Sequence, residues 1–131
     1  MKRVAIAALT VLVLAQALPV SAQHGDEADI AYRRGLTYKS GGDSTLAAHW
    51  LGVAAARGMP EAMFKLAVML LEGDGVARDE AGARRWLDAA AELDYPEAWQ
   101  QLGLIEPDPQ RAAQYMRRAE HALTHRREGQ R

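Results

Sequence analysis

The sequence predicts an all-α fold built from about three stacked helical hairpins. Apolar residues recur at three- and four-residue spacing from Pro60 to Leu71 and again from Asp79 to Leu93, which is typical of helices that bury one face. Gly73 and Gly75 lie between these stretches and favour a tight turn, since glycine adopts backbone conformations that other residues avoid. These observations predict one helical hairpin in the middle of the 131-residue chain.

The hairpin is repeated on both sides of this central copy. Residues 58–62 (Gly-Met-Pro-Glu-Ala) return 36 residues later as residues 94–98 (Asp-Tyr-Pro-Glu-Ala). The segment around Trp50 matches the segment around Trp86, again 36 residues on, and a third copy places Tyr115 at the equivalent position. A hairpin of this size cannot bury its own apolar faces, so we expect the copies to stack on one another.

The central copy has Leu66-Ala67 in its first helix and the pattern Gly-x-Gly-Val-x2-Asp-x3-Ala-x2-Trp-x2-Ala-Ala from Gly73 onward. This pattern resembles the Sel1-like repeat, a relative of the tetratricopeptide repeat (TPR). The outer copies lack the Gly-x-Gly-Val loop, and Gly82 and Asp94 stand where that family usually has Lys and Gly. The resemblance implies a short right-handed, TPR-like α-solenoid over residues 29–124, with repeats at about 29–59, 60–95 and 96–124.

The boundaries of the individual helices follow from local signals. Pro60 and Pro109 suit the first position of a helix, and Asp79 and Asp108 are suitable N-caps. We expect first helices near Asp29–Lys39, Pro60–Leu71 and Pro96–Ile105, and second helices near Ser44–Arg57, Asp79–Leu93 and Pro109–Thr124. Residues 23–28 are expected to form a short mobile leader, and residues 125–131 a basic, frayed tail.

The first 22 residues have the features of a cleavable secretory signal peptide. Met1-Lys2-Arg3 is basic, Val4 to Leu18 is almost wholly apolar, and Val20-Ser21-Ala22 offers small residues for cleavage before Gln23. Because no cysteine follows the apolar run, we expect no lipid anchor. Thr10, Gln16 and Pro19 interrupt the run, so we expect no stable membrane anchor after cleavage. The sequence therefore predicts export, and the family resemblance implies the periplasm of a Gram-negative bacterium.

Composition narrows the possible functions. Without Lys2 and Arg3, the 16 basic residues become 14 against 17 acidic ones, so the mature chain has a net charge of −3 and no basic excess of the kind that binds nucleic acid. The chain has no cysteine, and it shows neither a nucleophile motif nor a Ser-His-Asp order, so we expect no enzymatic activity and no cofactor.

Two groups of residues have metal-ligating side chains, but their spacing favours solvated or capping roles over metal binding. His121 and His125 are four residues apart on a helix, but the sequence places no cysteine and no evident carboxylate beside them. The acidic residues of the turn lack the spacing of a calcium loop; they are Glu72, Asp74, Asp79 and Glu80. The sequence therefore predicts no metal site.

A second apolar stripe on the central first helix is the strongest candidate for a binding surface. Phe64, Val68 and Leu71 point away from the stripe expected in the core, and first helices line the concave groove in TPR-like stacks. The predicted groove residues are Tyr32, Leu36, Lys39, Phe64, Val68, Leu71, Glu72, Gln100 and Leu104. The same stripe is also consistent with ordinary packing between repeats.

The preferred function is a non-enzymatic periplasmic module that binds a segment of a protein partner along the concave face. One alternative is an envelope-associated regulator that binds peptidoglycan or a cell-wall enzyme. For glycan stacking, Tyr32, Tyr38, Phe64 and Tyr95 are the available aromatic residues. A second alternative is a structural subunit that associates with itself through an incompletely capped end.

Overall fold

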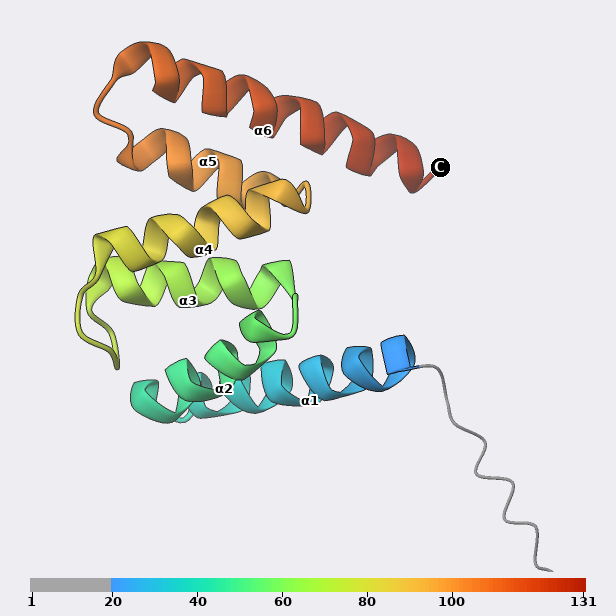
Figure 1. Ribbon diagram of the computed structural model, residues 1–131, viewed down its shortest axis with the longest axis vertical. Helices are drawn as coiled ribbons and strands as arrows, with labels where there is room; N and C mark the ends of the chain where they lie inside the picture. Colours follow the sequence, from blue (N-terminus) through green and yellow to red (C-terminus); the bar gives the residue numbers. More distant parts are fainter. Residues whose placement is uncertain (1–19) are drawn as a thin grey trace, which may run out of the picture.

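The computed structural model describes residues 20–131, which form six α helices and no strand (Figure 1). The helices are α1 (Val20–Ser40), α2 (Ser44–Ala56), α3 (Pro60–Glu72), α4 (Glu80–Glu92), α5 (Pro96–Ile105) and α6 (Pro109–Gly129). The predicted all-α fold is confirmed. Within residues 20–131, the helices are too short or too polar to span a bilayer.

The helices pair into three hairpins, α1–α2, α3–α4 and α5–α6, which stack along the long axis of the molecule (Figure 1). All the substantial helix–helix contacts join helices that are adjacent in the sequence. This arrangement is an α-solenoid, in which each repeat buries its apolar faces against its neighbours.

Aspartate side chains cap the starts of α2, α4 and α6. The Asp79 side chain accepts a hydrogen bond from the Gly82 amide at 2.9 Å, and the Asp108 side chain accepts one from the Gln110 amide at 3.0 Å. Both predicted caps are confirmed. Asp43 caps α2 in the same way, since it accepts from the Leu46 amide at 3.0 Å.

The core consists of small alanines around a few large side chains. Leu51 and Leu87, at equivalent positions of α2 and α4, are fully buried, and Leu102 is fully buried in α5. Trp86 and the other aromatic residues of the repeat pattern are half-buried and pack against this core. Gly35 on α1 is buried against Leu51, and it must be glycine because a side chain there would collide with Leu51. The alternation of small and large residues brings the helices close together.

Both outer helices are longer than the sequence predicts. The expected mobile leader, residues 23–28, is the helical start of α1, where Glu27 forms an ion pair with Arg57. The expected frayed tail is mostly helical as well, since α6 continues to Gly129. Tertiary ion pairs at both ends supply stabilisation that local composition does not show. The predicted signal peptide, residues 1–22, lies almost wholly outside the described residues.

The loop between α3 and α4 reaches back to the first repeat. Figure 1 shows this loop descending toward the turn that joins α1 and α2. Gly75 lies there with a φ of 73°, and its Cα faces the backbone carbonyl of Ser44 so closely that a Cβ would not fit. Next to it, Asp74 forms an ion pair with Lys39 at the end of α1. The loop therefore joins the central repeat to the first one.

Candidate functional site

A pocket lies between the first helices of the first two repeats. Its volume is about 190 Å³, and its apolar lining comes from α1, α2 and α3. The lining residues are Leu36, Lys39, Leu51, Phe64, Lys65, Val68, Met69 and Glu72. We call this feature the α1/α3 pocket.

Five of the nine predicted groove residues meet in this pocket, namely Leu36, Lys39, Phe64, Val68 and Glu72. Phe64 and Val68 are half-buried, so the stripe that they form contributes to packing and also leaves apolar surface open to a ligand.

The other four predicted groove residues lie elsewhere. Tyr32 and Leu71 are half-buried and pack against the core. Gln100 and Leu104 are exposed on α5, and Leu104 is 70% exposed. The geometry thus concentrates the candidate site at the junction of the first two repeats instead of along all three first helices.

Three pocket residues escaped the sequence analysis. Leu51 belongs to a second helix and is almost wholly buried, yet it lines the pocket from α2. Met69 is buried in α3, and Lys65 lies at the rim. Lys65 lies three residues before Val68, so helical spacing places both on one face and could have predicted its position at the pocket. The position of Leu51 depends instead on how two helices pack.

The ion pair between Lys39 and Asp74 borders one end of the pocket. The hydrogen bonds that Asp74 accepts from Lys39 and Ser44 lower the pKa of its carboxyl group below the ordinary value. The carboxylate therefore stays ionised, and it holds the α3–α4 loop beside the pocket.

An aromatic and charged cluster lies at the start of α5. The rings of Phe64 and Tyr95 pack with centroids 5.7 Å apart, and the guanidinium of Arg126 lies 5.6 Å from the centroid of Tyr95. Arg126 also donates hydrogen bonds of 3.0 and 3.1 Å to both carboxylate oxygens of Glu97. These hydrogen bonds lower the pKa of Glu97, whereas burial, with a smaller effect of nearby carboxylates, raises the pKa of Tyr95 to about 12.

The same cluster bears on glycan binding, which needs exposed aromatic faces. Tyr32, Phe64 and Tyr95 are half-buried against the core, and Tyr38 is 37% exposed. These four rings do not form a shared open platform, so the geometry gives glycan stacking little support.

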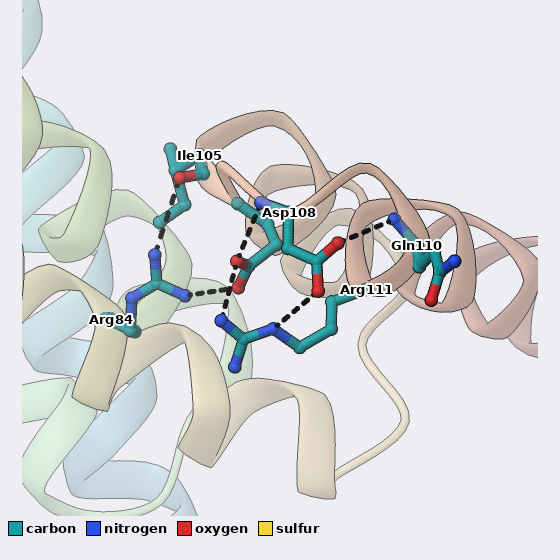
Figure 2. A network of polar contacts seen from close by, with 6 residues as sticks. Arg84, Ile105, Asp108, Gln110 and Arg111 are labelled. Atoms are coloured by element: carbon teal, nitrogen blue, oxygen red, sulfur yellow. Dashed lines mark hydrogen bonds and ion pairs between the residues drawn. The ribbon is translucent and has the colours of Figure 1, made fainter.

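A second polar network surrounds a buried carboxylate between α5 and α6 (Figure 2). The Glu106 side chain is only 3% exposed and accepts from Arg84 at 3.3 Å, from Arg111 at 3.2 Å and from the Asp108 amide at 3.2 Å. Arg84 also donates to the carbonyl of Ile105 at 3.4 Å. This network joins the second and third repeats and satisfies the buried charge, which is a structural role.

The predicted absence of a metal site remains a prediction. Within residues 20–131, no group of three or more His, Cys, Asp or Glu side chains converges to hold an ion. The acidic residues of the α3–α4 loop take part in capping and ion pairing, since Asp79 caps α4 and Asp74 pairs with Lys39. His121 and His125, by contrast, lie in direct contact.

The three hairpins also match a known family in sequence. The Sel1 repeat profile matches residues 27–59, 60–95 and 99–121, which together make up more than half of the chain. The chain belongs to the Sel1 repeat family. Proteins of this family are generally protein–protein interaction modules and are typically non-catalytic. No curated protein matches this Sel1 repeat chain in sequence.

Two solved structures show the same architecture. One is a Sel1 repeat protein from Oxalobacter formigenes, with 29% sequence identity and a TM-score of 0.68. The other is c5321, a protective antigen of uropathogenic Escherichia coli strains that displays an SLR fold, with 29% identity and a TM-score of 0.69. The matches cover 72% and 76% of this chain but only 43% and 24% of those proteins. The Sel1 repeat chain thus spans less than half the length of either.

Proposed function

We propose that this Sel1 repeat chain is an exported, periplasmic interaction module that binds a segment of a partner protein in the α1/α3 pocket. The observation that carries the proposal is the pocket itself, whose apolar lining lies open between two repeats. At about 190 Å³ it is smaller than the ~300–1,000 Å³ typical of small-molecule sites. A pocket of this size suits a single bulky side chain that anchors a longer segment.

The charges at the rim indicate the chemistry of that segment. Lys39 is already paired with Asp74, whereas the ion pairs of the described residues include neither Lys65 nor Glu72. Lys65 therefore has its charge available for a carboxylate on the ligand. By the same reasoning, Glu72 has its charge available for a basic group on the ligand. We expect a bulky apolar residue with an acidic and a basic residue nearby in the partner segment.

The periplasmic location rests on the N-terminal sequence. The basic start, the apolar run and the small residues before Gln23 are the features of a cleavable signal. Fractionation of cells that produce the intact chain tests this part of the proposal. Recovery of a product starting at Gln23 with the periplasmic contents would support it, and recovery of the uncleaved chain in the cytoplasm would contradict it.

Site-specific photo-crosslinking in the cell tests the binding site. A photoreactive residue at Lys65 lies at the rim, and the same residue at exposed Arg85 on α4 is the control. One discrete adduct, found from position 65 and not from position 85, is expected. The second chain of that adduct identifies the partner segment.

A pair of substitutions then separates the pocket from the wider groove. Val68→Lys places a charge in the pocket and is expected to abolish the adduct, while helical content and thermal midpoint stay close to those of the parent, because the lysine stem can reach solvent. Leu104→Lys makes the same kind of change outside the pocket and should leave the adduct intact. An adduct that survives Val68→Lys contradicts the proposal. Unfolding of Val68→Lys would show that the stripe serves the core alone.

A further inference from the structure

His121 and His125 lie side by side on the exposed face of α6. Their Nε2 atoms are 3.2 Å apart, and their rings meet edge to face with centroids 4.4 Å apart. The two nitrogens lie at hydrogen-bonding distance, and the tautomer decides which ring donates. The function proposed above makes no use of this pair.

The separation of the two nitrogens falls within the range of donor–donor distances found when two histidines bind one metal ion. Metal–imidazole bonds of about 2.0–2.1 Å with an angle of about 90–109° place the two donor atoms about 2.8–3.4 Å apart. The observed 3.2 Å lies within this range, so an ion can replace the proton that the two rings share. We propose that His121 and His125 form a surface site for a divalent transition-metal ion, in the class of Cu²⁺, Ni²⁺ and Zn²⁺.

The surroundings of the pair suit metal binding. Glu128 Oε2 lies 3.8 Å from Nδ1 of His125, on the side of the ring away from His121. This separation is longer than a hydrogen bond, so the carboxylate acts on the ring through its charge alone, which favours a proton on Nδ1 and leaves Nε2 to bind the ion.

Another carboxylate, Asp94 on the α4–α5 turn, lies near the pair. Asp94 lines a hollow together with His121 and His125. Asp94 has a φ of 55°, the one positive φ of a non-glycine residue among residues 20–131. This conformation belongs to the end of α4, at a position that the Sel1-like repeat usually fills with Gly. Asp94 does not complete a three-residue ligand group, so it acts on water bound to the ion instead of on the ion itself.

The neighbouring cations are directed elsewhere. The Arg118 guanidinium lies over the Trp99 ring, 4.9 Å from its centroid, and Arg126 forms two hydrogen bonds with Glu97. Arg126 also lines the hollow, and the Glu97 carboxylate balances its charge. With two protein ligands and water in the remaining positions, the site would be an open one.

Titration of the purified, untagged chain with Cu²⁺ tests the site. The background for every sample is the double variant His24→Ala, His49→Ala, so that His121 and His125 are the only imidazoles in the chain. Calorimetry should show one ion per chain, and the electron paramagnetic resonance spectrum should show coupling to two imidazole nitrogens.

Three further variants in this background define the outcome. His121→Ala and His125→Ala are exposed changes and should each weaken binding by about a hundredfold, since the second bond of a chelate forms intramolecularly. Asp94→Asn, which tolerates the same backbone conformation, should weaken binding by about tenfold. Equal affinities of the parent and of both single-histidine variants would overturn the proposal, as would a spectrum with a single nitrogen. Circular dichroism of each variant verifies that α6 is still formed.

Discussion

Replacing Gly75 by alanine tests whether the α3–α4 loop joins the first two repeats. Gly75 has a positive φ, and a Cβ at this position would overlap the carbonyl group of Ser44, which belongs to the rigid start of α2. Gly73, two residues earlier, also has a positive φ, but a Cβ there would meet its nearest neighbour, Arg78, at an ordinary 3.5 Å. The two glycines thus share the conformational constraint and differ in the clash.

The expected magnitudes follow from this difference. A left-handed alanine costs about 1–2 kcal/mol, and the smaller entropy of the unfolded chain offsets about 0.4–1 kcal/mol of that cost. Gly73→Ala should therefore reduce the free energy of unfolding by about 1 kcal/mol. Gly75→Ala adds overlap with backbone that cannot rotate away, which typically costs a further ~1–3 kcal/mol, for a total of about 2–4 kcal/mol.

Urea denaturation followed by circular dichroism measures both values. A second readout is hydrogen exchange at the amides of α2, which should speed up in Gly75→Ala and stay nearly unchanged in Gly73→Ala. Equal losses of stability in the two variants would refute the reasoning, because the contact with Ser44 would then contribute nothing.

Three further outcomes are expected from the charged groups. Glu106→Ala should lower the free energy of unfolding by about 2–3 kcal/mol, because it removes the hydrogen bonds that charged groups make to a buried carboxylate. Arg111→Ala should lower it by less than about 1 kcal/mol, since Arg111 is 62% exposed. Equal losses for the two variants in urea denaturation would contradict this. The Arg126 guanidinium lowers the pKa of Glu97, so the stability that this pair adds is present above the ordinary pKa of 4.5 and is lost as the pH falls through the lower value in the folded state. The stability difference between the parent and Arg126→Ala should therefore shrink from about pH 7 to about pH 3, and a constant difference would argue against the pair. Burial raises the pKa of Tyr95 to about 12, so a pH titration of phenolate absorbance should show one ionisation near pH 12 that is absent in Tyr95→Phe. Because the neutral phenol is favoured in the folded state, the free energy of unfolding should fall as the pH rises above the ordinary pKa of 10.0.

The sequence predicted the parts of the fold that local signals determine. Pro60 and Asp79 mark helix starts because their preferences involve only the adjacent turn of backbone. The extents of α1 and α6 were underestimated, since the Glu27–Arg57 and Glu97–Arg126 pairs that hold their ends join residues far apart in the sequence.

In the candidate site, too, some features follow from local sequence and others from contacts between distant residues. Phe64 and Val68 were predicted from helical spacing and do line the α1/α3 pocket. The contribution of Leu51 and the pairing of Lys39 with Asp74 depend on the packing of α3 and its following loop against the first repeat. No periodicity within a single helix carries that information, so these features emerged only in three dimensions.

The position of the α1/α3 pocket across two repeats has a thermodynamic consequence. Because each helix mainly contacts its sequence neighbours, the molecule behaves as a short row of coupled units, and an end unit can detach while the others remain folded. The pocket exists only while the first hairpin is docked on the second, since its walls come from both. A segment bound there stabilises the contact between the two hairpins, so any change that weakens the docking of the first hairpin also lowers the affinity for the segment.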